Sequence, residues 1–167
     1  RAILELERAV RDLRLVGAYI GTDFGTDLDH PTLDPFWAAA SELNVTIFIH
    51  PAPWGIDGPL RDERIRRFDL DLSLGFLFEE TLAVCCLVFG GVLDRHPNLD
   101  ICISHGGGAA AFMAGRLDVQ GRTRPWAREN PVDFTAGLRR LWFDNHVHDA
   151  QSLKLLSDRV GAERLVL

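Results

Sequence analysis

The stretch Val45-Thr46-Ile47-Phe48-Ile49-His50 decides the fold of this chain. It is short, apolar and rich in β-branched residues, which is typical of a parallel strand buried on both faces. A second stretch, Leu99-Asp100-Ile101-Cys102-Ile103-Ser104-His105, repeats the pattern and also ends in histidine. We therefore predict two successive parallel strands, each with an imidazole at its carboxyl end.

Helical patterns alternate with strand patterns on both sides of these two stretches. We expect helices over about 3–13, 34–44, 79–93, 109–117 and 150–160, and further strands over 18–21, 141–143 and 165–167. Five strands without a hairpin signal predict a parallel α/β protein, either an open doubly wound sheet or most of a barrel. The glycine-rich fingerprints of dinucleotide and nucleoside triphosphate sites do not occur, so nucleotide binding loses its main support.

Composition narrows the possible partners of the chain. It has 167 residues, 47% of them hydrophobic, and a net charge of -6, which argues against a nucleic-acid-binding surface. The most apolar run, Leu82 to Leu93, is well short of the roughly 20 residues that cross a bilayer, so we expect a core helix and no membrane partner. Cys85, Cys86 and Cys102 lack disulfide or zinc-ribbon spacing, which favours a reducing, cytoplasmic location.

The two histidines at the strand ends are the main chemical signal. Reacting groups in parallel barrels project from the carboxyl ends of strands, and imidazole is the commonest side-chain ligand of a catalytic divalent metal. His50 and His105 could instead be satisfied structural histidines, but their coincidence at two strand ends favours a site. Gly106-Gly107-Gly108 after the second strand can leave backbone N–H groups free to face that site, form a tight turn with positive φ, or do both.

Other polar residues have weaker claims to a role. Asp144, His146 and His148 alternate after a strand and resemble a ligand cluster, but capping and support of neighbouring groups explain them better. We expect His30 and His96, each beside a helix end, to be structural. A further group is locally basic and could gather a carboxylate, although a solvated charged face is favoured: Arg61, Arg64, Arg66 and Arg67.

Four segments resemble the amidohydrolase-related family, and most closely its aminocarboxymuconate-semialdehyde decarboxylase group. They are Phe48-Ile49-His50-Pro51, the run from Glu80-Thr81 to Gly90-Gly91-Val92-Leu93, Ser104-His105-Gly106-Gly107-Gly108 continuing to Gly115-Arg116-Leu117, and Phe143-Asp144-Asn145-His146-Val147-His148-Asp149 leading into Val160-Gly161-Ala162-Glu163-Arg164. Their order and spacing agree over nearly the whole chain.

The resemblance implies a (β/α)8 barrel with one divalent metal, usually zinc, with manganese as the other candidate. By this matching, residues 1–167 form a single incomplete barrel domain with strands four to eight, without the first strands and the end of the last. His50 would bind the metal, and His105 would hydrogen-bond the metal-bound water and carry its proton. Arg116 would reach a substrate carboxylate across a homodimer interface, and Trp54 is a further candidate for substrate binding.

We therefore expect a metal-dependent nonoxidative decarboxylase that acts on a small unsaturated or aromatic carboxylic acid. A hydrolase or hydratase on the same barrel is the nearest alternative, and a non-catalytic α/β binding module is the second. With strands missing, the barrel does not close, so we expect the isolated chain to be inactive and poorly stable.

Overall fold

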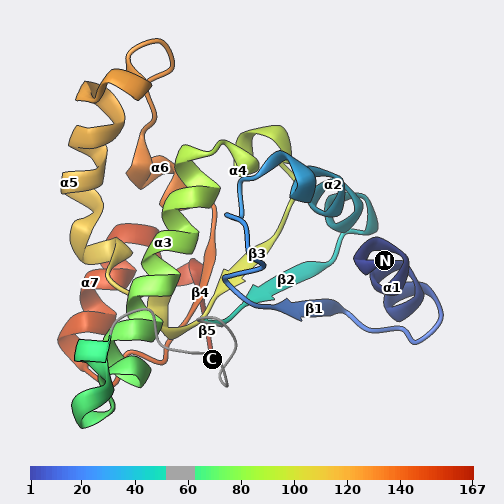
Figure 1. The fold of residues 1–167 in the computed structure, drawn as a ribbon, viewed down its shortest axis with the longest axis horizontal. Helices are drawn as coiled ribbons and strands as arrows, with labels where there is room; N and C mark the ends of the chain where they lie inside the picture. Colours follow the sequence, from blue (N-terminus) through green and yellow to red (C-terminus); the bar gives the residue numbers. More distant parts are fainter. Residues whose placement is uncertain (52–62) are drawn as a thin grey trace.

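Five strands form one parallel sheet in the computed structural model, which describes residues 1–51 and 63–167. They are β1 (Gly17–Ile20), β2 (Thr46–Ile49), β3 (Ile101–Ile103), β4 (Trp142–Asp144) and β5 (Leu165–Val166), in that spatial order. Each strand pairs with the next one along the chain (Figure 1), whereas a doubly wound sheet reverses its order at a switch point. The partial barrel expected from the sequence is confirmed.

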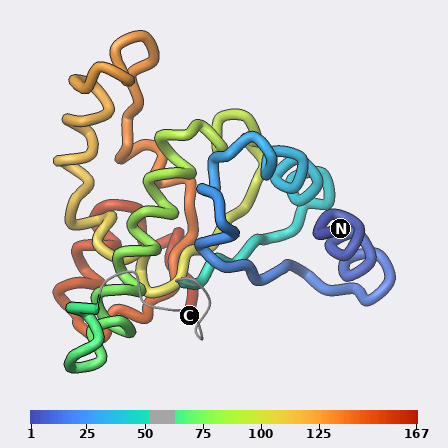
Figure 2. The backbone as a smooth tube through the Cα atoms, in the orientation of Figure 1, coloured from blue at the N-terminus to red at the C-terminus, as the bar shows by residue number. Residues whose placement is uncertain are grey.

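Helices connect the strands and cover the sheet. They are α1 (Ala2–Arg11), α2 (Asp34–Leu43), α3 (Phe76–Phe89), α4 (Val92–Arg95), α5 (Ala110–Thr123), α6 (Phe134–Leu138) and α7 (Ala150–Val160). Figures 1 and 2 show α1 and α2 beside β1 and β2, and α3, α5, α6 and α7 gathered at the other end of the sheet. Six short turns of other helix types complete the described part: Pro31–Leu33, Glu63–Asp69, Asp71–Gly75, His105–Gly107, Pro125–Ala127 and Ala162–Arg164.

The two faces of the sheet differ in burial. The row formed by Ile49, Ile103 and Phe143 is fully buried in the core. The next row by register begins at Tyr19, which is 62% exposed and stacks on Phe48 with 6.0 Å between ring centroids. Side chains alternate between faces along a strand, so His50, two residues after Phe48, continues on this less buried face.

The helix expected over 79–93 is two helices. A π-helical turn, Asp71–Gly75, leads into α3, which ends at Phe89, and Gly91 with φ +68° separates it from α4. The helical run from Asp71 to Phe89 is thus longer than the sequence indicated and, by length and composition alone, long enough to cross a membrane. It nevertheless places Glu79 and Glu80 against the protein interior, as a core helix does.

Two further boundaries differ from expectation. α5 continues to Thr123 instead of ending near Leu117, and Gly121 lies inside the helix at a point where the carbonyl of Val132 leaves no room for a side chain. The short helix α6 was not expected. Its signal is Asp133, whose side chain accepts a hydrogen bond from the backbone N–H of Ala136 as an N-cap.

Candidate functional site

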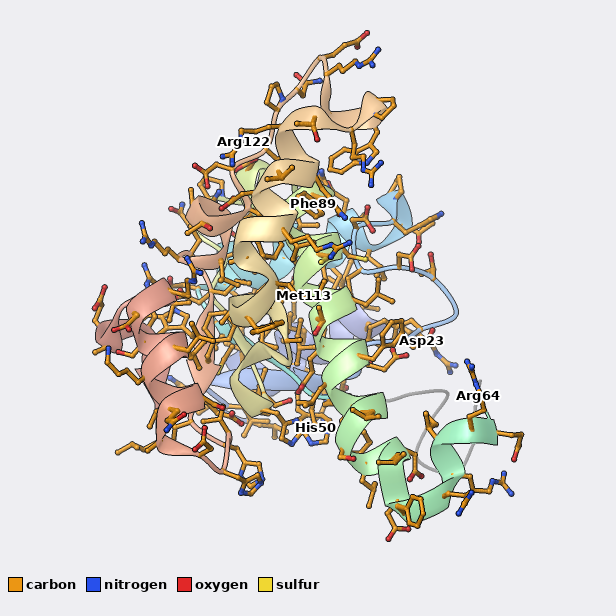
Figure 3. The ribbon with its side chains drawn as sticks, turned by 90° about the vertical axis from the view of Figure 1, so that its left-hand side faces the viewer. Asp23, His50, Arg64, Phe89, Met113 and Arg122 are labelled. Carbon is orange, nitrogen blue, oxygen red and sulfur yellow. The ribbon has the colours of Figure 1, made fainter. Side chains whose placement is uncertain are left out.

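His50 follows the last residue of β2 and is held by backbone contacts. Its N–H donates to the carbonyl of Ile20 on β1 (3.1 Å). Its side-chain Nδ1 lies 3.1 Å from the carbonyl of Pro51, and because a carbonyl only accepts, the ring proton is on Nδ1. Nε2 therefore keeps its lone pair, the arrangement in which histidine binds a metal. Figure 3 places His50 at the end of the sheet near the first turns of α3.

His105 follows β3 and converges on His50, with 5.0 Å between the ring centroids. Phe76, at the start of α3, contacts both rings, at 5.7 Å from His50 and 5.9 Å from His105. The sequence expectation that these two strand ends bring their imidazoles together is therefore confirmed by the geometry. The roles of metal ligand and proton carrier remain predictions.

The side chain of Glu80 on α3 contacts the ring of His105 inside the protein. Its Oε1 lies 2.7 Å from Nδ1 of His105 and also accepts a hydrogen bond from the hydroxyl of Ser104. Burial raises the pKa of Glu80 to about 8, and the nearby Asp144 adds to that rise. Burial also lowers the pKa of His105. Both shifts favour an uncharged pair, so we describe this contact as a hydrogen bond rather than an ion pair.

The glycine run after His105 forms a tight turn. Gly106, Gly107 and Gly108 have φ of +61°, +72° and +64°, a region that favours glycine. Their N–H groups donate to Asp144 Oδ1 (3.1 Å), the Ser104 carbonyl (2.8 Å) and the His105 carbonyl (3.2 Å). The alternative in which these N–H groups are free to face the site is wrong, because Asp144 binds the first of them and carbonyls of the turn bind the other two.

The segment after β4 supports its neighbours, as the sequence favoured. Asp144 accepts hydrogen bonds from the N–H groups of Gly106 and His146, and Asp149 caps α7 through the N–H of Ser152. His146 lies 5.3 Å from His105 and 4.1 Å from His148 by ring centroids. Among the described residues, however, no three His, Cys, Asp or Glu side chains are grouped to hold a metal ion.

A pocket of about 650 Å³ opens beside these histidines. His105, His146 and His148 are among the residues that line it, as are the apolar residues Phe76 and Leu156. A volume of this size matches that of small-molecule sites, which combine mostly apolar walls with a few polar groups. The pocket therefore gives His105 a space in which a small organic acid fits.

The remaining candidates lie away from this pocket or outside the described residues. Arg116 is exposed on α5 and does not line the pocket, and Trp54 lies outside the described residues, as does Arg61. His30 caps the short helix at Pro31–Leu33, and His96 contacts Asp34 (3.0 Å), so the structural roles expected for both are confirmed. Arg66 pairs with Glu63 in solvent, as a charged face does.

A family model described as Amidohydrolase matches residues 1–167. The chain belongs to the amidohydrolase family. It is 36% identical over 169 residues to 2-amino-3-carboxymuconate-6-semialdehyde decarboxylase of Dictyostelium discoideum, a match that covers 99% of this chain and 46% of that protein. The resemblance to the aminocarboxymuconate-semialdehyde decarboxylase group is therefore confirmed, and the chain spans about half the length of such relatives.

Solved structures give the same family picture. The 5-carboxyvanillate decarboxylase of Sphingomonas paucimobilis superposes with a TM-score of 0.83 at 26% identity, over 99% of this chain and 50% of that one. A dihydroxybenzoic acid decarboxylase of Polaromonas shares the fold, with a TM-score of 0.77 at 22% identity over 99% of this chain and 53% of that one. That structure holds bound manganese.

Sequence reasoning assigned no role to two residues of the site, Glu80 and Phe76. Glu80 did carry a signal, since Glu79 and Glu80 are the two charged residues of a largely apolar helix, and Glu80 is fully buried. A buried charge needs a partner, and the partner here lies 25 residues further along the chain. Phe76 carried no signal, because aromatic residues at the start of an apolar helix usually serve the core.

Proposed function

We propose that this chain supplies part of the active site of a metal-dependent nonoxidative decarboxylase, which acts on a small unsaturated or aromatic carboxylic acid. The observation that carries the proposal is the meeting of His50 and His105, 5.0 Å apart, at the ends of adjacent parallel strands. Both use Nδ1 for a contact inside the protein, so each offers Nε2 to the site. The similarity to decarboxylases over nearly the whole chain supports the reaction class.

The residues present fit one ligand position of a divalent metal. His50 has its Nδ1 satisfied by the Pro51 carbonyl, which fixes the ring and leaves Nε2 for the ion. The described residues do not supply a full ligand set, so further ligands would come from other parts of the protein. We propose zinc as the metal, with manganese as the alternative. When bound, the ion supplies a positive charge that holds and polarises the substrate.

His105 carries the proton in this proposal. The bond between the substrate carbon and its carboxylate breaks, carbon dioxide leaves, and the electron pair of that bond takes a proton at carbon. His105 lines the pocket, and in this proposal its basic Nε2 first takes up a proton from solvent and then delivers it to that carbon. The lowered pKa of His105 makes the protonated ring a stronger acid, so it gives up that proton more readily once it has taken it up.

We also propose a homodimer in the cytoplasm. Arg116 is exposed on α5, away from the pocket of its own chain, which suits a side chain that reaches the substrate carboxylate of a second subunit. Trp54, three residues after Pro51, is proposed to contact the substrate. The three cysteines are free thiols, in keeping with a reducing compartment.

The test uses the intact protein that contains this chain, loaded with zinc or manganese. We expect it to release carbon dioxide from at least one member of a panel of amino-carboxymuconate, dihydroxybenzoate and carboxyvanillate acids, with a product lighter by one carbon dioxide. A product heavier by one water would instead identify a hydratase. A protein that holds no metal and turns over none of these acids would be the non-catalytic module.

A further inference from the structure

We propose that Glu80 is a positioning residue, which holds His105 with its proton on Nδ1 and so presents the basic Nε2 to the substrate. This inference rests on the proposed function, because it gives His105 the task of moving a proton. Glu80 itself does not touch the substrate, since its side chain is fully buried beneath the histidine ring.

The geometry around Oε1 of Glu80 carries the inference. Nδ1 of His105 lies 2.7 Å from this oxygen, and the hydroxyl of Ser104 donates to the same atom. Two donors from consecutive residues fix the carboxyl group between them, so the imidazole has one favoured rotation. The exposed fractions, 19% for the histidine and 0% for the glutamate, place the pair at the boundary between the core and the pocket.

The backbone of the turn that carries His105 is strained and is also anchored to α3. His105 has φ +45°, an unusual value for a residue with a side chain, and three glycines with positive φ follow it. Thr81, next to Glu80 on α3, accepts a hydrogen bond from the N–H of Ala109 at 2.8 Å. Consecutive residues of one helix therefore anchor both ends of the turn. A local backbone strain maintained by such contacts is typical of functional sites.

The orientation does not depend on whether Glu80 is charged. Oε1 accepts from Nδ1 as a carboxylate oxygen and equally as the carbonyl oxygen of a neutral acid. Within the described part of the chain, Oε2 has no hydrogen-bond partner, so it can carry the proton of the neutral form. Glutamine reproduces the acceptor at Oε1, whereas methionine keeps the length of the side chain and removes the acceptor.

The first test reads the tautomer without turnover. In the intact protein loaded with diamagnetic zinc and labelled with 15N-histidine, the His105 signals are assigned by their loss in His105→Gln. We expect the Nδ1–H tautomer in the wild type and in Glu80→Gln, and its loss in Glu80→Met. A wild-type His105 with its proton on Nε2 would overturn the proposal even if the methionine variant did not fold.

The second test separates positioning from support of the core. We expect Glu80→Met to lower kcat about 10- to 100-fold with little change in KM, because the group that orients a functional histidine is lost. Glu80→Gln keeps the acceptor, so we expect it to retain most of the wild-type kcat. Glu79→Gln is the matched control, because Glu79 is a buried neighbour on α3 that accepts from Thr22 instead.

The outcomes distinguish this inference from the proposed function. If Glu80→Met folds and keeps both the tautomer and kcat, Glu80 has no positioning role. The same conclusion follows if kcat falls as far in the control Glu79→Gln as in Glu80→Met. If the tautomer depends on Glu80 as expected but no sample releases carbon dioxide from any acid, the orientation stands and the proposed decarboxylation fails.

Discussion

β2 and β3 both end in histidine, but they hold it by different means. At β2 the ring of His50 is fixed by the carbonyl of the next residue, a contact made within one dipeptide. At β3 the ring of His105 is fixed by Glu80, a side chain from a helix that comes earlier in the chain. A ligand needs only a free Nε2 in a fixed place, whereas a proton carrier also needs its acidity set by its surroundings.

The largest effect expected is on metal binding at β2. His50→Ala removes the proposed ligand, so we expect the intact protein to lose stoichiometric metal and with it all measurable turnover. Metal analysis by mass spectrometry after gel filtration measures this. His96→Ala is the control, because this histidine contacts Asp34 away from the site. Retention of full metal content by His50→Ala would show that the two strand ends do not differ as proposed.

His105→Gln sharpens the same comparison at β3. We expect kcat to fall about 10²- to 10⁴-fold, the usual contribution of a general acid or base, while the metal content stays at the wild-type level. Steady-state kinetics and metal analysis on one sample give both numbers. If the metal leaves together with the activity, His105 is a ligand like His50.

The glycine turn after β3 predicts a loss of stability. In Gly108→Ala, the new Cβ would meet the carbonyl of Leu77 at φ +64°, so we expect a loss of about 1–3 kcal/mol from the strained backbone alone. Gly115→Ala is the matched control, since a Cβ there meets open space on α5, and a gain of about 0.5–1 kcal/mol is expected. Urea unfolding of both variants measures the difference. Equal stabilities would contradict the turn.

The smallest effect expected is a pH dependence of stability from Glu80. Its pKa of about 8 in the folded protein lies above the ordinary value of 4.5, so the folded state binds the extra proton between these values. The stability that Glu80 contributes is complete below pH 4.5 and is lost as the pH rises through 8. The lowered pKa of His105 makes the stability rise with pH instead. This opposite effect is confined to pH values below about 6.5, the ordinary pKa of histidine.

The window from pH 6.5 to 8 therefore isolates Glu80. We expect the unfolding free energy of metal-free protein to fall there by at most about 1.4 kcal/mol per pH unit, and Glu80→Gln to lack this slope. Chemical denaturation at several pH values is the measurement. If Glu80→Gln keeps the full wild-type slope, another titrating group causes the pH dependence.

The strands were predictable because their signal is local. Val45 to Ile49 and Leu99 to Ile103 are apolar, β-branched runs, and register then places the two following histidines together without further information. The break at Gly91 and the short helix α6 were not predicted, since each depends on a turn that packing selects. The direction of the Gly106 N–H group depends on Asp144, a contact 38 residues away.

Glu80 shows where local signals end in the site. Its charge in a largely apolar helix indicates that it has a partner inside the protein, but not which residue that partner is. The partner is defined only when α3 packs against the end of β3, as the buried contact with Ser104 and His105 shows. Sequence could therefore identify the two imidazoles but not the group that orients one of them.

Glu80 and Thr81 also have a consequence for motion. One binds His105 and the other binds Ala109, so the turn between them is attached at both ends to a single helical turn of α3. Local opening of a protein occurs in cooperative units. The backbone amides from Gly106 to Ala109 should therefore exchange their hydrogens on the timescale of α3, and this loop should behave as part of a helix.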